Sequence, residues 1–363
     1  MSKEKPKIVL SMIVKNEAEV IAKTLLSLKD VLSYYVICDD VNTTDNTEAI
    51  AKDILKDIPG EYHKCEWKNH SHNRNLALDL ARPHGDFILI ADADDPWTCV
   101  QSEFQNLNSN YQFYNVLIKH NSIEYYRPLL INSKANCKFI GVVHECLEGL
   151  NYGSKLNHTF VTYGGNGSSH ALPDKFLRDA KMLEEDLLID PDNPRSYFYL
   201  AQSYRDANDI PNAIKNYEIR SNMNKGWIDE VYISLLELGK IYSTIPAYFH
   251  KVENTLLRAF IINTNRSEAL IYLSKFFREQ NEYFKSFLYS NIAIQILKPK
   301  DALFIEYACY TWKPLDEFAI SAYYIGKYKL AADINKKLLN DPSLPNEQRN
   351  RIIMNLQFCE SKL

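Results

Sequence analysis

The sequence has little glycine, 11 residues in 363, and no run that approaches the ~18 consecutive apolar residues of a membrane span. It contains no G-x-x-x-x-G-K-[ST] loop and no G-x-G-x-x-G segment after a strand, which argues against nucleotide sites built on glycine-rich loops. The apolar stretch at residues 8–14 is short and is followed by Lys15 and Glu17. It therefore predicts a buried strand rather than a signal peptide, and we expect no membrane span.

An excess of positive charge and paired cysteines are also missing. Lys and Arg total 42 against 46 Asp and Glu, a net charge of −4, which argues against nucleic acid or an anionic membrane as a partner. The 7 cysteines are odd in number and include no C-x-x-C pair, so they predict reduced thiols and a reducing, cytoplasmic compartment. The composition that remains, 46% hydrophobic and 24% charged over 363 residues, is typical of a folded soluble protein of two domains.

The first 95 residues alternate short apolar runs with helical patterns. Strands are expected at residues 8–14, 34–38 and 87–90, with helices between them, and this order predicts an α/β domain with a mainly parallel sheet. Ligands bind at the carboxyl ends of the strands in such sheets. We therefore expect Asp40, after the second strand, to share one edge of the sheet with the acidic cluster that follows residues 87–90.

That cluster is the segment FILIADADDPW, in which a buried strand ends in Asp92, Asp94 and Asp95. A surface turn is one explanation, because Asp and Pro are common in turns. However, three acids at the rim of a buried strand repel one another unless a cation neutralises them, which favours a site for Mg²⁺ or Mn²⁺. An aspartyl-phosphate phosphatase is disfavoured, because Pro96 stands where that chemistry needs a small hydroxyl residue.

Beyond about residue 177 the strands give way to helical pairs rich in Tyr, Leu and Ala. Six residues fall at the offsets of a tetratricopeptide repeat: Tyr197, Leu200, Ala201, Tyr204, Ala213 and Tyr217. Later units match less well and are irregularly spaced. Degenerate helical repeats are the favoured interpretation, and a plain helical bundle is the alternative.

The segments SMIVKNEAEVIAKTLLSL, ICDDVNTTDNT, HNRNLAL and ILIADADD, in this order, resemble family 2 glycosyltransferases of the GT-A fold. The later VHE segment and the helical extension resemble a subgroup of that family that acts in cell-wall or glycan biosynthesis. The resemblance covers roughly residues 7–220. It implies a Rossmann-like GT-A catalytic domain at residues 1–175 and a tetratricopeptide-like, all-α helical-repeat domain at residues 176–363.

The resemblance implies a nucleoside pocket on the first two strands. Main chain from Ile13 to Lys15, with Glu17, would line it, and Asp40 would accept hydrogen bonds from the donor's base. Asp39 is a rival for the role of Asp40. Glu17 fits equally well as an acid placed before a helix, where the helix dipole favours negative charge.

The resemblance also assigns the diphosphate and the metal. Arg74 and Asn75 would face the diphosphate, for which an arginine offers planar paired donors. Asp92 and Asp94 match the family's D-x-D motif, so they would contact the nucleotide and hold Mn²⁺ or Mg²⁺. Asp95 would orient these groups or bind the metal through water.

For the acceptor side, the resemblance implies Glu145 as the general base, with His144 as a metal ligand or acceptor contact and Asp95 as a rival base. Tyr163 stands where the family tends to place a histidine. His158 and His170 lie nearby, and His170 is the expected third metal ligand. The following YGGNGSS segment would form either a lid over the donor or a linker to the helical domain.

The sequence thus predicts a metal-dependent inverting glycosyltransferase. A uridine diphosphate (UDP) sugar is the expected donor, and an acceptor hydroxyl of a glycan or a protein receives the sugar. The helical domain would hold the acceptor or mediate a homodimer. The alternative is a catalytically inactive GT-A-fold protein that acts as a binding or scaffold module through its helical repeats.

Overall fold

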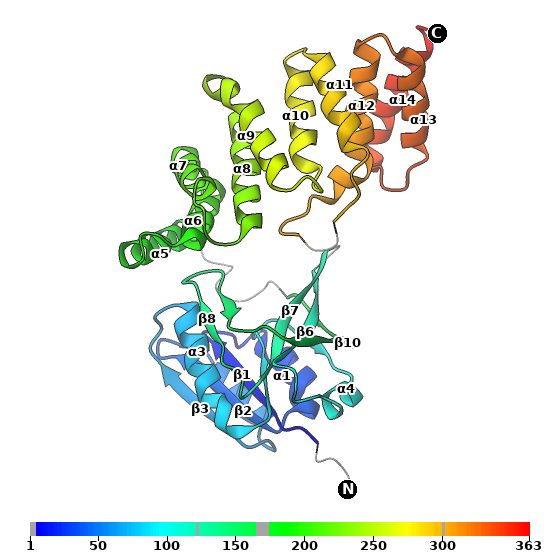
Figure 1. Cartoon of the computed structure of the whole chain (residues 1–363). Helices are drawn as coiled ribbons and strands as arrows, with labels where there is room; N and C mark the ends of the chain where they lie inside the picture. Colours follow the sequence, from blue (N-terminus) through cyan, green and yellow to red (C-terminus); the bar gives the residue numbers. More distant parts are fainter. Residues whose placement is uncertain (1–4, 121–122, 165–173, 300–301) are drawn as a thin grey trace. The chain divides into compact units, whose positions relative to one another are not determined.

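A computed structural model of the chain describes residues 5–120, 123–164, 174–299 and 302–363. The chain divides into two compact units, Met1–Asp186 and Leu187–Leu363, shown in Figure 1. The domain boundary expected at residues 175/176 coincides with the start of helix α5 (Lys175–Ile189), whereas the division between the units falls inside that helix. Each unit is described by itself below.

The N-terminal unit is built on an eight-stranded sheet in the order β3-β2-β1-β4-β7-β6-β10-β5. Strands β3, β2, β1, β4, β6 and β10 run in one direction and β7 and β5 in the other, which confirms an α/β fold with a mainly parallel sheet. The strands are β1 (Ile8–Val14), β2 (Tyr34–Asp40), β3 (Gly60–Cys65), β4 (Phe87–Ile90), β5 (Trp97–Thr98), β6 (Phe113–His120), β7 (Ile123–Asn132) and β10 (Gly153–Thr162).

Short helices connect these strands, and a separate hairpin follows β7. The helices are α1 (Ile21–Leu28), α2 (Thr47–Ile54), α3 (His70–Ala81) and α4 (Gln101–Gln105), and the hairpin consists of β8 (Lys138–Ile140) and β9 (Cys146–Glu148). Helix α1 buries Ile21, Leu25 and Leu28, as its apolar spacing predicts. Strands β1 and β4 are buried almost throughout, because α3 and other elements cover the centre of the sheet.

The C-terminal unit consists of helices that pack mainly on the helices next to them in sequence. Nine of them are α6 (Pro194–Asp206), α7 (Ile210–Ser221), α8 (Ile228–Tyr242), α9 (Phe249–Ile262), α10 (Glu268–Glu279), α11 (Tyr283–Ala293), α12 (Trp312–Tyr324), α13 (Tyr328–Leu339) and α14 (Asn346–Glu360). Alternate helices also touch, α6 with α8, α8 with α10 and α10 with α12. This nearest-neighbour pattern is typical of stacked helical hairpins and confirms a helical-repeat unit.

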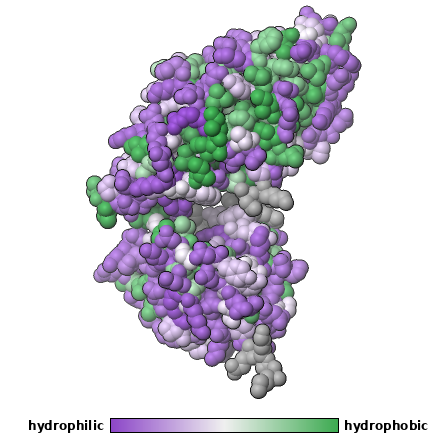
Figure 2. Space-filling model, viewed as in Figure 1, coloured by the Kyte–Doolittle hydropathy of each residue, from purple (hydrophilic) through white to green (hydrophobic). Residues whose placement is uncertain are grey.

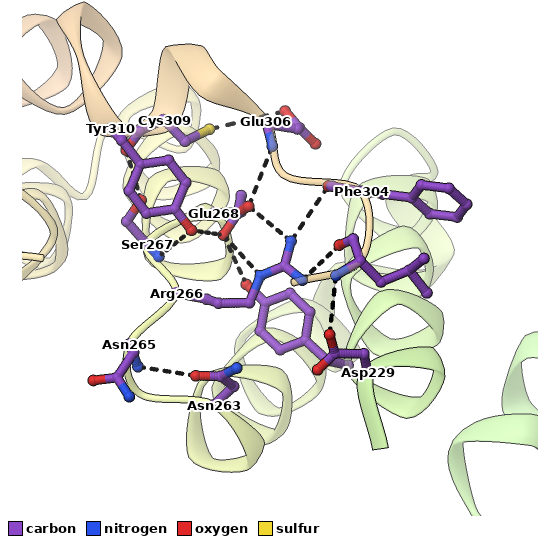
Figure 3. A network of polar contacts seen from close by, with 12 residues as sticks. Asp229, Asn263, Asn265, Arg266, Ser267, Glu268, Phe304, Glu306, Cys309 and Tyr310 are labelled. Atoms are coloured by element: carbon purple, nitrogen blue, oxygen red, sulfur yellow. Dashed lines mark hydrogen bonds and ion pairs between the residues drawn. The ribbon is translucent and has the colours of Figure 1, made fainter. Parts of the chain in front are cut away.

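A buried ion pair ties the connection between α11 and α12 to the start of α10, as Figure 3 shows. Arg266 and Glu268 are both fully buried and lie 2.8 Å apart. Arg266 also donates to the main-chain oxygen of Leu303 at 2.7 Å, and Tyr310 donates its hydroxyl to Glu268 at 2.5 Å. These bonds satisfy both buried charges and hold residues 303–310 against the helices.

Figure 2 shows apolar side chains gathered on the viewed face of the helical unit, whereas the viewed face of the N-terminal unit is mostly hydrophilic. Within the described ranges, no helix has both the length and the apolar character that a membrane crossing requires. All seven cysteines are free thiols.

Candidate active site

The acidic segment lies where the sequence places it, at the carboxyl edge of the parallel sheet. Strand β1 pairs in parallel with β2 on one side and with β4 on the other, so the ends of these strands meet at one edge. Asp40 ends β2, and Asp92, Asp94 and Asp95 follow β4 within a turn. Ala91 and Ala93 are buried beneath this turn, which anchors it to the core.

Arg74 connects the acidic turn to the loop that carries Glu145. The side chain of Arg74 is only 9% exposed, and it donates to Asp92 Oδ1 at 2.5 Å and to Glu145 Oε1 at 2.6 Å. Burial alone would raise the pKa of both carboxyls, but Arg74 holds the pKa of each below its ordinary value. Three residues far apart in sequence therefore form one charged cluster in which both carboxylates are ionised.

Asp95 differs from Asp92 because it is buried and has no cationic partner within ion-pair distance among the described residues. Burial, reinforced by repulsion from Asp92 and Asp94, raises the pKa of Asp95 to about 7. The main-chain N–H of Gly164 donates to Asp95 Oδ1 at 2.9 Å. A methyl group on Gly164 would overlap the main-chain oxygen of Asp94, so only glycine allows this close approach.

No group of three or more His, Cys, Asp and Glu side chains in the described ranges is arranged to enclose a metal ion. The chemistry of Asp92 and Asp94 nevertheless fits Mg²⁺ or Mn²⁺, which usually take one or two carboxylates and complete their shell with water and substrate phosphates. The raised pKa of Asp95 is in line with such a site, since burial raises it first and the charges of Asp92 and Asp94 raise it further. His170, the expected third ligand, lies outside the described residues.

The expected nucleoside pocket contains carboxylates that already have partners. Asp40 accepts hydrogen bonds from the main chain and side chain of Asn42, at 2.8 and 2.9 Å, and pairs with Lys15 at 2.6 Å. Burial alone would raise the pKa of Asp40. The hydrogen bonds from Lys15 and Asn42 outweigh that effect, so the pKa lies below its ordinary value. Asp39 is fully buried and bonds to Tyr62 and Lys64. A base that contacts Asp40 must therefore replace Lys15, whose side chain is 46% exposed and can move.

The other residues expected in the pocket, Ile13 and Glu17, lie on the same edge of the sheet. The contacts described for them are made by their main chain. Ile13 is a partly buried residue of β1 and pairs with Cys38 of β2. The main-chain N–H of Glu17 donates to Thr47 at 2.8 Å, and its carbonyl oxygen accepts from Ile21, the first residue of α1. Glu17 thus opens the turn into α1, in agreement with the alternative role before a helix.

Asn75 has a different role from the expected diphosphate contact. Its side-chain amide donates to the main-chain oxygen of Phe139 at 2.9 Å and accepts from the N–H of Phe139 at 2.7 Å. Asn75 lies on the side of α3 that faces β8. Both the N–H and the oxygen of its amide are therefore used on the main chain of β8. Asn75 therefore pins the β8–β9 hairpin, and the loop that carries Glu145, to α3.

The loop between β8 and β9 presents His144 and Glu145. Gly141 and His144 both adopt positive φ angles, +93° and +50°, which turn the chain sharply before β9. The side chain of Glu145 is 11% exposed and faces Arg74, whereas His144 is exposed. The structure thus brings Glu145 into the charged cluster and leaves His144 at its surface.

Tyr163 lies directly before Gly164, and its pKa is raised by burial and then by the charges of Asp95 and Asp94. It therefore faces the acidic turn, although it cannot ligate a metal as a histidine would. His158 is an exposed residue within β10, and its main-chain N–H binds Glu103 of α4. Of the YGGNGSS segment, only Tyr163 and Gly164 lie within the described residues.

Two further basic residues belong to the cluster, and the sequence patterns did not identify them as site residues. His70 lies one helical turn before Arg74, and burial lowers its pKa beside Arg74 in spite of the attraction of Glu145. Arg127 of β7 lowers the pKa of both Asp92 and Asp95, yet it forms no ion pair with any described residue. Two sequence signals could have identified them. His70 stands four residues before Arg74 on the same helix, and Arg127 is a charge within a strand pattern.

An open, mainly parallel sheet with an acidic turn beyond its fourth strand is the arrangement expected of a GT-A type glycosyltransferase domain. Residues 10–99 match the sequence model of the family described as Glycosyl transferase family 2. The N-terminal unit is thus a glycosyltransferase domain similar to family 2 members over residues 10–99, and a helical-repeat domain follows it in the sequence.

Curated relatives give the same assignment. The SPbeta prophage-derived glycosyltransferase SunS of Bacillus subtilis (strain 168) is 27% identical over 293 residues, which cover 73% of this chain and 67% of SunS. The glycosyltransferase SunS of Bacillus phage SPbeta matches equally.

Among solved structures, S. aureus TarS 1–349 in complex with UDP is 15% identical, with a TM-score of 0.36 over 71% of this chain and 89% of that one. A thermophilic TPR protein of Thermus thermophilus is also 15% identical, with a TM-score of 0.36 over 50% of this chain and 91% of that one.

Proposed function

We propose that this glycosyltransferase moves a sugar from a UDP-sugar to an acceptor hydroxyl with inversion, in a reaction that requires Mn²⁺ or Mg²⁺. The observation that carries the proposal is the arrangement of Asp92, Asp94 and Asp95 at the sheet edge, with Arg74 and Glu145 beside them. A diphosphate leaving group develops negative charge during transfer, and this edge has the residues to manage it.

Asp92 and Asp94 would hold the metal through one carboxylate oxygen each. Asp92 commits Oδ1 to Arg74, which leaves Oδ2 for a cation, and the ionised state of Asp92 suits a hard divalent ion. The bound ion would supply Lewis-acid stabilisation of the leaving diphosphate. Arg74 would keep Asp92 in place, since it donates to Asp92 Oδ1 while its second bond, to Glu145, fixes the guanidinium.

Arg127 is the residue that we assign to the donor's phosphates. Arg74 uses its Nε and Nη2 groups on Glu145 and Asp92, so these two carboxylates already fix its guanidinium. Arg127 approaches the same cluster from β7 and keeps its guanidinium outside any ion pair with the described residues. Arginine recognises phosphate oxygens through paired hydrogen bonds, which suits this position.

Glu145 would act as the general base that takes the proton from the acceptor hydroxyl. One of its oxygens binds Arg74, which orients the carboxylate, and the other accepts no hydrogen bond from a further side chain among the described residues. Its lowered pKa keeps it in the unprotonated form that a base requires. Asp95 is the rival base, and the two variants in the experiment below separate them.

The helical-repeat domain would hold the acceptor, which is a glycan or a protein, or join two copies of the chain. Stacked hairpins of this kind offer extended surfaces for such contacts. The second candidate function, an inactive scaffold that acts through its repeats, is favoured by the committed state of Asp40 and by the tyrosine at position 163.

A donor-turnover assay tests the proposal. Purified protein is mixed with UDP-sugars one at a time, with Mn²⁺, Mg²⁺ or EDTA, and released UDP is measured for the wild type and for Asp94→Ala, Glu145→Gln and Asp95→Asn. We expect metal-dependent release that Asp94→Ala abolishes. Glu145→Gln should remove transfer while UDP binding by calorimetry persists, and Asp95→Asn should retain more activity than Glu145→Gln. Release that EDTA leaves unchanged, or no release with any donor, would refute the enzyme as described.

A further inference from the structure

The helical unit contains a cavity of about 450 Å³ far along the chain from the transferase residues. Helices α12, α13 and α14 form its walls, and the end of α10 closes it through Arg278. Small-molecule sites in proteins usually span ~300–1,000 Å³. The cavity is therefore of a size that can take a small ligand or part of a larger one.

Two arginine–carboxylate pairs fix the charge of this cavity. Arg278 binds both oxygens of Glu317, at 2.7 and 3.0 Å, and Arg351 binds both oxygens of Asp316, at 2.7 and 3.0 Å. Each pair joins two helices and leaves no net charge. An anionic ligand such as a phosphate would meet the negative charge of Asp316 as well as arginines that carboxylates already neutralise, so the cavity suits a neutral ligand.

Aromatic side chains supply its apolar surface. Tyr324 and Phe358 line the cavity and are 56% and 54% exposed, and Trp312 and Tyr323 lie beside them. The ring of Tyr324 stacks on Tyr283 at 4.0 Å with an angle of 7°, which limits its motion. Rigid aromatic faces of this kind contact flat apolar surfaces of a ligand at little entropic cost.

Amide groups supply the polar surface. Asn335, Gln348 and Asn355 all line the cavity, and each amide can donate and accept. Asn335 is only 1% exposed, and its Oδ1 has no hydrogen-bond partner among the described residues, while its Nδ2 donates to Ala331. A buried acceptor left in this state costs ~1–3 kcal/mol, which a hydroxyl that reaches the floor of the cavity would offset.

We propose that this cavity binds a neutral oligosaccharide. Each ring of such a ligand offers apolar C–H faces to aromatic side chains and carries several hydroxyls that both donate and accept. That combination matches aromatic faces surrounded by amides and by a carboxylate, Asp316, that can still accept hydroxyl protons. A peptide main chain offers one donor and one acceptor per residue and matches the grouped amides less well. The site is separate from the transferase residues and does not depend on the proposed reaction.

Calorimetry and tryptophan fluorescence test the site without donor or metal. Maltotriose, cellotriose and chitotriose are titrated one at a time into the full chain, with a capped alanine–serine peptide as the alternative ligand. Trp312→Phe identifies the part of the fluorescence change that arises at the cavity. Phe358→Ala and Tyr324→Ala remove aromatic walls, and Phe284→Ala, an exposed aromatic residue of α11 outside the cavity, is the matched control.

We expect at least one trisaccharide to bind with a change in Trp312 fluorescence. Phe358→Ala and Tyr324→Ala should each weaken binding roughly tenfold, and Phe284→Ala should leave it unchanged. The three alanine variants exchange exposed side chains, and thermal unfolding confirms that they fold. Binding of the peptide alone, no binding of any trisaccharide, or binding that all three variants retain equally would overturn the proposal. Because UDP and metal are absent, failure here leaves the proposed transfer reaction untouched.

Discussion

Gly164 donates its main-chain N–H to Asp95 Oδ1 at 2.9 Å and lies against the main chain of Asp94. Through this contact the chain that leaves β10 supports the acidic turn after β4, at a residue 69 positions earlier in the sequence. Two contacts thus fix the position of the turn: its connection to the buried strand β4, and the hydrogen bond from Gly164. The geometry of the proposed metal site depends on both supports.

The first prediction follows from this contact. Gly164→Ala should reduce transfer by about 100-fold or more, because the added methyl group displaces Asp94 and the near-attack geometry is lost. The measure is kcat/KM for UDP release with Mn²⁺. Gly326→Ala is the control, since a methyl group there meets no atom within 4 Å, and the strain that it adds at φ +79° lies in the helical unit and should leave activity unchanged. Equal activity in both variants would contradict the support that we assign to Gly164.

The second prediction concerns the cluster around Arg74. Arg74→Met should destabilise the protein by up to about 3–5 kcal/mol, because it leaves Glu145, 11% exposed, and the partly exposed Asp92 without the arginine that balances them. Adding Glu145→Gln to Arg74→Met should recover part of that loss. The measure is a double-mutant cycle of thermal unfolding, and strictly additive effects of the two substitutions would argue against a shared cluster.

The third prediction is a pH dependence of stability from Asp95. Its pKa is about 7 in the folded protein against an ordinary 3.8, so between these values the folded state binds the proton more tightly than the unfolded state. Stability should therefore fall as pH rises from about 4 to about 7, by up to about 4 kcal/mol from this group. Metal-free wild type and Asp95→Asn are compared by thermal unfolding across this range. The difference between them should grow with pH, and a constant difference would contradict the assignment.

The fourth prediction separates the two arginines. Arg127→Met should raise the KM for the donor roughly tenfold while the fold remains intact, because Arg127 pairs with no described carboxylate that its loss would strand. Lys155→Met on β10 is the control, since Lys155 is a cation that lies over the ring of Tyr126, at 4.0 Å. If Lys155→Met and Arg127→Met raise KM alike, the effect is one of general charge and the phosphate role fails.

The fifth prediction concerns the buried pair of the helical unit. Glu268→Ala should destabilise this unit by about 3–5 kcal/mol, because Arg266 then remains fully buried without the carboxylate that balances its charge. Glu279→Ala on the same helix removes a 45% exposed carboxylate and should change stability by no more than about 0.5 kcal/mol. Calorimetric unfolding of the full chain reports both, and similar shifts would show that the pair contributes little.

Much of the fold follows from local sequence patterns. Strands β1, β2 and β4 and helix α3 form close to where their apolar runs predict them, because a buried parallel strand needs a continuous apolar run and a helix needs one apolar face. The same patterns place Asp40 and the DADD segment on one edge of the sheet. The change from strands to Tyr- and Leu-rich helical pairs predicts the second unit, since nearest-neighbour packing is a local property.

What each charged group does was decided by contacts between distant segments. Arg74 and Asn75 are adjacent in one helix, yet Arg74 reaches Asp92 and Glu145 while Asn75 binds the main chain of Phe139. Neighbouring helical positions point about 100° apart, so the partner of each depends on which strand or loop packs on that side.

The state of Asp95 also depends on contacts between distant segments. Within one acidic segment Asp92 is tied to a buried arginine, whereas Asp95 is buried beside Gly164. Sequence alone determined that acids gather at the end of a buried strand. The arrival of the arginine from elsewhere in the chain decided that Asp92 is ionised, and burial beside two other acids decided that Asp95 holds its proton near neutral pH. Desolvation and Coulomb energies depend on three-dimensional distance and not on spacing in sequence.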